Sequence, residues 1–134
     1  MGLSTMILGR SVCKFLRDQP TSPAVKICGL TDIEQALTIA AMGADAIGVI
    51  GVAGTPRYVK DTTRRALFSQ LQLRFPALQR VWVVADASVE ELDAALRGQG
   101  TPTVIQLHGD ESPAQCLALR QRYPQTRLWK ALRL

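Results

Sequence analysis

The sequence predicts an α/β domain built on a mainly parallel β-sheet. Short apolar runs without polar alternation recur along the chain, as is typical of strands covered on both faces. A helical pattern follows each of the first four runs. Strand starts recur roughly every 22 to 34 residues, which is about the length of one βα unit. Right-handed crossovers then wind such a sheet in one direction.

The expected strands share an excess of apolar and β-branched residues, which favours buried strands over helices in runs this short. They are 24–28, 46–52, 80–85, 103–107 and 127–132.

A helix is expected after the first strand, because its apolar residues fall on one stripe at helical spacing. Thr31 and Glu34 have the spacing of a capping box at its start. The stripe consists of Ile33, Ala36, Leu37, Ala40 and Ala41.

The second helix is expected over 61–74, and Pro76 prevents its continuation. Four residues are predicted to face the sheet: Ala66, Leu67, Leu71 and Phe75.

The third and fourth helices each begin with a capping box, Ser88 with Glu91 and Ser112 with Gln115. Pro113 suits the first turn of the fourth helix. The residues expected to face inward are Val89, Leu92, Ala95 and Leu96 in the third helix and Cys116, Leu117, Leu119, the stem of Arg120 and Tyr123 in the fourth.

Composition excludes several classes of function. The chain has 134 residues, 47% of them hydrophobic, and no apolar run approaches the roughly 20 residues that span a membrane. The net charge is +5, but Lys and Arg are scattered and aromatic residues make up only 5%, so nucleic acid is not expected as a partner. The charge suits a small phosphorylated substrate. The three cysteines have no metal-binding spacing and are expected to be reduced thiols.

Counting the units predicts a partial barrel. Four βα units and a fifth strand make half of a (β/α)8 TIM barrel, which needs about 250 residues when complete. We therefore expect residues 24–134 to form the N-terminal half of such a barrel, preceded by a loosely ordered extension over 1–23. The open sheet edges would suit a complementary half-barrel or self-association.

Cys28 stands at the point of greatest chemical interest in this pattern. It ends the first strand, and Gly29 allows a turn into the following helix. In α/β folds, ligands bind where strands end in this way. From the residues alone, Cys28 is either a reactive thiol or a buried, inert one.

Four motifs in register make the sequence resemble the phosphoribosylanthranilate isomerase family of tryptophan biosynthesis. The resemblance extends from about Val25 to the last residue. The motifs are Lys-Ile-Cys-Gly-Leu-Thr at 26–31, Gly-Ala-Asp-Ala-Ile-Gly at 43–48, Thr-Pro-Arg-Tyr-Val at 55–59 and Gln-Leu-His-Gly-Asp-Glu at 106–111.

This resemblance implies a cytoplasmic enzyme that needs no cofactor or metal and catalyses an Amadori rearrangement of N-(5′-phosphoribosyl)anthranilate. It implies that Cys28 is the general base, a role that requires the thiolate form. Lys26 lies two residues earlier on the same face of the strand and could assist.

The resemblance also implies three substrate-binding residues. Arg57 matches the family's arginine that binds the anthranilate carboxylate, for which a guanidinium group is well suited. Gln106 and His108 alternate onto one face of the fourth strand and are expected to form a pocket wall or an orienting group. Asp86 is expected to be a cap or turn residue rather than a catalytic acid. Asp110 and Glu111 are given no catalytic role.

Two departures from the family pattern matter. The family's catalytic aspartate and its phosphate-binding loops would fall after Leu134, so the chain alone is expected to be inactive. Val49 and Gly51 stand where the family often has phenylalanines, which suggests an altered pocket wall. The alternative function is a non-catalytic half-barrel that serves as an interaction module.

Overall fold

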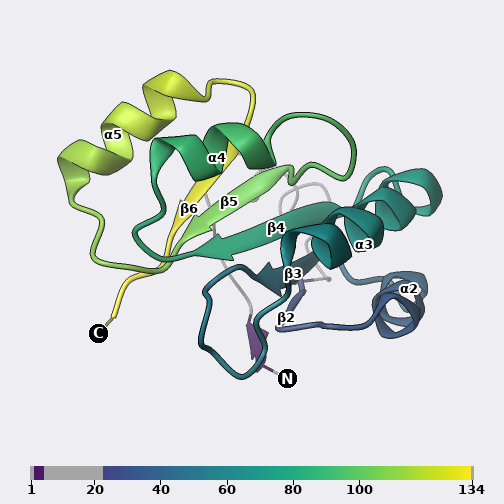
Figure 1. Cartoon of the computed structure of the whole chain (residues 1–134). Helices are drawn as coiled ribbons and strands as arrows, with labels where there is room; N and C mark the ends of the chain where they lie inside the picture. The colour runs from purple at the N-terminus through teal and green to yellow at the C-terminus, as the bar shows by residue number, and fades with distance from the viewer. Residues whose placement is uncertain (1, 5–22, 134) are drawn as a thin grey trace.

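The computed structural model describes residues 2–4 and 23–133. Within them, five parallel strands alternate with four helices, and the sheet order follows the sequence order (Figure 1). The strands are β1 Gly2–Ser4, β2 Lys26–Cys28, β3 Ala46–Ile50, β4 Gln79–Val84, β5 Val104–Leu107 and β6 Arg127–Lys130. The helices are α2 Ile33–Ala41, α3 Asp61–Arg74, α4 Val89–Ala95 and α5 Pro113–Arg122.

The five parallel strands and four helices confirm the predicted fold class. The strand β1 was not predicted, and it pairs antiparallel with β2, so that edge of β2 is covered rather than open. The outer edge of β6 has no strand partner among the described residues. The loosely ordered extension predicted over 1–23 lies largely outside the described residues, which leave out residue 1 and residues 5–22.

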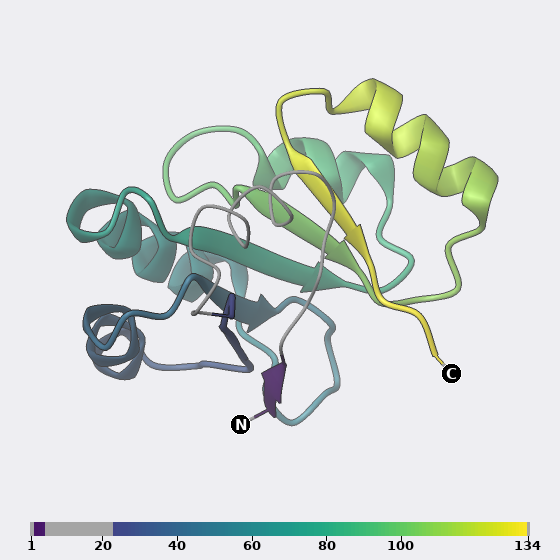
Figure 2. The same ribbon diagram turned by 180° about the vertical axis from the view of Figure 1, so that it is seen from behind.

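The helices lie on one face of the sheet, and the view from behind presents the strands (Figure 2). Two core clusters join strands to helices on the helix-facing side. One contains Ile47, Val49, Leu67 and Phe68, and the other contains Val84, Leu92, Ile105 and Leu107. A third cluster contains strand residues alone and marks the opposite face, which we call the inner face; it comprises Ala46, Val81, Val83, Val104 and Trp129, with Cys28 and Ile50 against it.

A charged residue belongs to the helix-facing core. Arg64 of α3 is only 1% exposed, and its guanidinium group lies 4.7 Å from the centroid of the Trp82 ring. The Asp61 carboxylate pairs with it, and burial lowers the pKa of Arg64 despite this partner. An arginine thus replaces an apolar residue at a position facing the sheet, because a ring face and a carboxylate compensate its charge.

A second arginine of α3 joins neighbouring βα units. Arg65 donates hydrogen bonds to the carbonyl oxygens of Ala94, Arg97 and Gln99, at 2.6 to 2.8 Å. These carbonyls lie at and beyond the end of α4, where a helix runs out of i+4 N–H donors. The Ala94 oxygen also accepts from the Arg97 N–H at 3.3 Å. The helix end is therefore capped from the preceding unit.

The helix starts confirm two of the three predicted capping boxes, those of Ser88 with Glu91 and Ser112 with Gln115. The box predicted for Thr31 and Glu34 is wrong. Asp32 is the N-cap of α2 instead, and its carboxylate accepts a hydrogen bond from the Gln35 N–H at 3.1 Å. The shift is one residue, and a carboxylate is as good an N-cap as a hydroxyl.

The predicted helix faces are partly wrong. Leu67, Leu71, Leu92 and Ala95 are buried as expected, whereas Ala41, Ala66, Val89, Leu117 and Arg120 are exposed. Arg64 and Phe68 occupy the buried positions of α3 in place of Ala66. None of the helices in the described part of the chain is long and apolar enough to cross a membrane.

Candidate active site

The corner after β2 places Cys28 at the carboxyl end of the parallel sheet. Gly29 adopts a φ of +84°, which an L side chain rarely takes. The N–H groups of Gly29 and Leu30 both donate to the Gly48 carbonyl oxygen, at 3.0 and 3.3 Å. Leu30 is 1% exposed and anchors the corner in the core. The half-buried Cys28 thiol is free of any disulfide.

Gly48 provides the space in which the Cys28 side chain lies. It is the register partner of Cys28 in the neighbouring strand β3. A Cβ atom at position 48 would lie 2.8 Å from Cys28 Sγ and 3.0 Å from Lys26 Cε. The first distance is shorter than real Cβ contacts and the second is tighter than most, so a side chain at position 48 would have to displace the thiol and press on the lysine stem. The thiol and the lysine therefore share one gap on the inner face.

Lys26 is joined to Gln106 across the sheet. Its side chain is 4% exposed, and Nζ donates a hydrogen bond to Gln106 Oε1. The two residues are 80 positions apart in the sequence, and the intervening strands β3 and β4 bring them together. Burial lowers the pKa of Lys26, and the charge and hydrogen bond of the neighbouring Cys28 oppose this effect in part.

His108 continues the row at the mouth of the sheet. Its ring Nδ1 lies 3.4 Å from Gln106 Nε2, and its backbone N–H donates to the Val84 carbonyl oxygen at 2.8 Å. The imidazole is exposed, while Leu107 between them faces the helices. The alternation expected for Gln106 and His108 is therefore present. Together with the Lys26–Gln106 hydrogen bond, it gives a row of polar side chains that runs from Cys28 through Lys26 and Gln106 to His108.

Arg57 reaches the same corner from the loop between β3 and α3. Its Cδ and Nη1 atoms each lie 3.0 Å from the position that a Cβ atom on Gly29 would occupy. The Val59 N–H donates to the Ile50 carbonyl oxygen at 2.9 Å and holds the end of this loop against β3. Arg57 is exposed and pairs with no carboxylate among the described residues. Its guanidinium group is therefore available to an anion beside Cys28.

The expected change in the pocket wall at Val49 and Gly51 is wrong. Val49 is fully buried in the cluster that joins β3 to α2 and α3, on the helix-facing side. A Cβ atom on Gly51 would lie 2.1 Å from Trp82 Nε1, and Trp82 packs in the same helix-facing layer. Since strand residues alternate between faces, Gly48 and Ile50 line the inner face instead.

A second polar cluster joins the loops after β4 and β5 to the end of strand β6. Glu111 is 9% exposed and accepts hydrogen bonds from the N–H groups of Asp86 and Gly109 and from Lys130 Nζ. Lys130 also donates to the Gly109 carbonyl oxygen. Burial tends to raise the pKa of Glu111, but the hydrogen bonds from Lys130 and Asp86 outweigh it and leave this pKa below its ordinary value.

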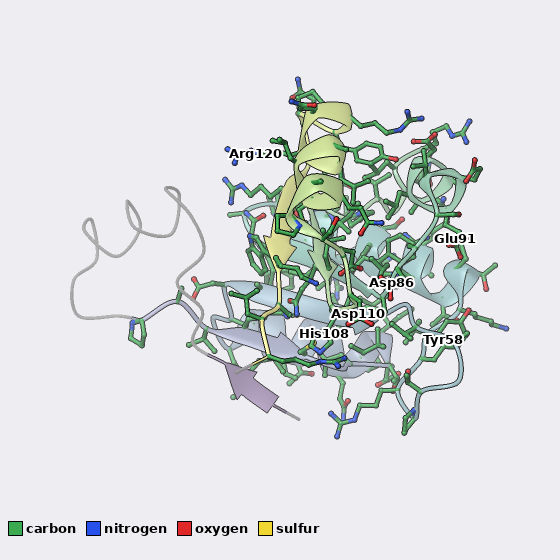
Figure 3. All side chains as sticks on the ribbon, turned by 90° about the vertical axis from the view of Figure 1, so that its left-hand side faces the viewer. Tyr58, Asp86, Glu91, His108, Asp110 and Arg120 are labelled. Carbon is green, nitrogen blue, oxygen red and sulfur yellow. The ribbon has the colours of Figure 1, made fainter. Side chains whose placement is uncertain are left out.

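Asp86 belongs to this cluster as a turn residue. Its φ of 51° lies in the left-handed region, which Asp tolerates better than most side chains. Its carboxylate accepts from the Asp110 N–H at 3.1 Å, and the two residues lie together at this edge (Figure 3). The prediction that Asp86 is a turn residue is confirmed. The sequence did not predict that Glu111 and Lys130 join these segments. The indication that it offered was the position of Glu111, an acid between a strand end and a helix cap.

Within residues 2–4 and 23–133, no three His, Cys, Asp or Glu side chains come together to hold a metal ion. The described site instead combines one thiol, one buried amine, one amide, one imidazole and one exposed guanidinium group. Such a set can exchange protons at Cys28 and bind an anion at Arg57.

Comparison with known proteins adds an independent finding. Residues 25–133 match the model of the N-(5′-phosphoribosyl)anthranilate (PRA) isomerase family. The chain is 46% identical over 110 residues to the N-(5′-phosphoribosyl)anthranilate isomerase of Synechococcus elongatus, covering 82% of this chain and 50% of that relative. It is 45% identical over 115 residues to the enzyme of Thermosynechococcus vestitus, covering 86% and 48%.

Solved structures agree with this match. The phosphoribosylanthranilate isomerase of Thermus thermophilus superposes with a TM-score of 0.69 at 32% identity, covering 81% of this chain and 51% of that one. The Thermotoga maritima enzyme gives 0.70 at 29% identity, covering 80% and 49%. The chain spans about half the length of the curated relatives it matches. It belongs to the N-(5′-phosphoribosyl)anthranilate isomerase family.

Proposed function

We propose that this chain carries the base-bearing half of a phosphoribosylanthranilate isomerase. The observation that carries the proposal is the position of Cys28. Its thiol lies at the carboxyl end of the first parallel strand, in the gap above Gly48, with Arg57 at the same corner. All these residues fall within the part of the chain that matches the family.

Cys28 acts as the general base of the Amadori rearrangement. The substrate's opened form is a Schiff base, and the thiolate removes the proton from C2′. The electrons of the C2′–H bond then form the C1′–C2′ double bond of an enolamine, which becomes the aminoketose. A positioned base of this kind contributes about 10² to 10⁴ in rate. One related phosphoribosylanthranilate isomerase was solved in complex with reduced 1-(o-carboxyphenylamino)-1-deoxyribulose 5-phosphate, the reduced form of the aminoketose product.

Arg57 binds the anthranilate carboxylate. Its guanidinium group lies over Gly29, next to the base, and no described carboxylate competes for it. A bidentate contact would place the aromatic ring of the substrate at the mouth of the sheet. Gln106 and His108 form the wall opposite Arg57, where they orient the sugar.

Two parts of the reaction are not assigned to any described residue. Ring opening needs a general acid, and the substrate phosphate needs a binding site. The family resemblance implies that both lie in the second half of a barrel, so we propose that a complementary half-barrel supplies them. No cofactor is needed for this chemistry, and a cytoplasmic location remains a prediction.

The test follows the decay of phosphoribosylanthranilate fluorescence with the purified 134-residue chain. The assay is run with the chain alone and with a supplied C-terminal half of a related isomerase. We expect turnover only with the added half. Cys28→Ala should lower this turnover by at least about 10²-fold, because it removes the base. Cys116→Ala, a half-buried thiol on α5, is the matched control and should keep it.

The other outcomes are informative as well. Turnover by the chain alone would overturn the division of roles and point to Asp86 as an acid. A folded chain that is inactive in both assays would favour a non-catalytic half-barrel. The unpaired outer edge of β6 among the described residues is the observation that supports this second function. Self-association through that edge would then appear as a dimer in analytical ultracentrifugation.

A further inference from the structure

Lys26 is a buried cation without a carboxylate. It is 4% exposed, and no Asp or Glu among the described residues forms an ion pair with it. An ammonium group that is buried without a counterion is costly, and such a group either loses its proton or acquires an anionic partner. The neighbours of Lys26 therefore decide its charge.

Two described side chains lie beside Lys26 on the inner face. Gln106 Oε1 accepts a hydrogen bond from Nζ, but an amide is neutral and cannot balance the charge. The other neighbour is Cys28, which shares the gap above Gly48 with the lysine stem. Among the described residues, Cys28 is thus the group beside Lys26 that can become an anion.

We propose that Lys26 and Cys28 share one proton, and that Lys26 is the positioning residue that holds Cys28 as a thiolate. The step balances without any other reactant, because the proton of the thiol moves to the amine and gives an ammonium–thiolate pair. This inference deepens the proposed function, since it explains how Cys28 becomes a base. When two groups interact this strongly, each titration step describes the pair as a whole and cannot be assigned to one residue.

Other charged groups near Cys28 do not replace Lys26. Arg57 faces the corner from the β3–α3 loop, but it lies over Gly29 and is exposed to solvent. His108 is also exposed, and Gln106 stands between its ring and Lys26. Neither β3 nor β4 contributes a charged side chain to the inner-face cluster around Cys28. Solvent weakens the effect of the two exposed groups, whereas Lys26 acts from inside.

Gln106 has a defined part in this arrangement. Its oxygen holds Nζ in place, and its lack of charge leaves the thiolate as the anion that the ammonium stabilises. Glutamate has nearly the same shape and would supply a competing carboxylate. Gln106→Glu therefore tests the proposal without removing Lys26.

The experiment measures the ionisation of Cys28 directly. In a Cys13→Ser/Cys116→Ser background, the rate of alkylation by iodoacetamide and the thiolate absorbance at about 240 nm are followed against pH. We expect Lys26→Met to lower the alkylation rate near neutral pH about tenfold, because the thiolate loses its counterion. Gln106→Glu should lower it similarly. Lys26→Arg keeps a permanent positive charge and should stay within about threefold of the parent.

Circular dichroism of each variant shows whether it is folded. If Lys26→Met does not fold, the comparison of Lys26→Arg with Gln106→Glu decides the question. Equal or faster alkylation in a folded Lys26→Met variant would overturn the proposal and mean a neutral thiol beside a neutral amine. The readout does not depend on turnover. A failed isomerase assay would therefore count against the proposed function and leave this inference standing.

Discussion

The two faces of the sheet differ in how they tolerate charge. The helix-facing side is filled by aliphatic and aromatic residues from both layers. Arg64, the one fully buried charge among the residues described there, is met by Asp61 and by the face of Trp82. The inner face combines Trp129 and mostly small or β-branched apolar residues with Lys26, Cys28 and Gln106. Its buried ammonium has no carboxylate partner among the described residues.

This difference separates the residues that make the fold from those that carry chemistry. Helices close the outer side, so a polar group there depends on partners within the protein. Arg64 has Asp61 and the Trp82 ring, although its Nη1 atom has no hydrogen-bond partner among the described residues. The inner side opens toward the carboxyl ends of the strands, where a reacting molecule can complete a polar group. Substitutions on the two faces should accordingly change different observables.

The largest effect on stability is expected on the helix-facing side. Phe68→Ala removes a fully buried ring from α3 and should lower the free energy of unfolding by about 3 to 5 kcal/mol. Leu73→Ala on the same helix is the matched control, because Leu73 is 77% exposed and should cost less than about 0.5 kcal/mol. Urea unfolding followed by circular dichroism measures both. Equal losses would mean that α3 does not pack as described.

Gly48 in β3 and Gly51 directly after it face opposite sides of the sheet, so substitutions at the two positions test whether the two faces are independent. Gly48→Ala and Gly51→Ala should each lower the free energy of unfolding by about 1 to 3 kcal/mol, because both Cβ atoms meet occupied space. Only Gly48→Ala should also change the alkylation rate of Cys28, since its Cβ displaces the thiol. Gly51→Ala displaces Trp82 instead. A changed thiol in both variants would contradict the separation of the faces.

The smallest effect is expected for the loop cluster around Glu111. Glu111→Gln should lower the free energy of unfolding at pH 7 by about 1 kcal/mol, because the hydrogen bonds from Lys130 and two backbone N–H groups lose their charged acceptor. The folded state holds the pKa of Glu111 below its ordinary value. Its stabilisation is therefore present above the unfolded pKa and is lost as the pH falls through the acid range.

The effect of Glu111→Gln should depend on pH, which separates a charged stabilising contact from a general loss of packing. The difference between the parent and Glu111→Gln should be largest at neutral pH and should shrink below about pH 4. Glu90→Gln, an exposed acid in the first turn of α4, should show little difference at any pH. A constant difference for Glu111→Gln across the range would show that the carboxylate is not stabilised by folding.

Much of the fold could be predicted because its signals are local. The apolar runs, two capping boxes and the bounds of α3 each depend on residues within a few positions of one another. Whether Thr31 or Asp32 caps α2 depends on the backbone angles at these two adjacent positions, which the spacing of residue types does not show. The burial of Arg64 depends on Trp82, which lies on the next strand, so a pattern of apolar residues could not show it.

The candidate site shows the same division. Cys28, Arg57, Gln106 and His108 could be chosen from motifs, and the structure brings them to one edge of the sheet; their roles remain predictions. The contact of Lys26 with Gln106 spans 80 residues and depends on the registers of β2 through β5. The Glu111–Lys130 pair likewise joins a loop to a later strand. Contacts of this kind arise from tertiary register, which no single motif contains.

The gap above Gly48 also constrains how this sequence can change over generations. While Lys26 and Cys28 are both present, a mutation that adds a side chain at position 48 must displace one of them. Cys28 Sγ is the nearer of the two atoms, so a smaller residue at position 26 would relieve only part of that restriction. The order of substitutions therefore matters, since a side chain at 48 avoids the thiol only after position 28 has changed as well. Positions 28 and 48, which are register partners on neighbouring strands, should thus covary among homologous sequences.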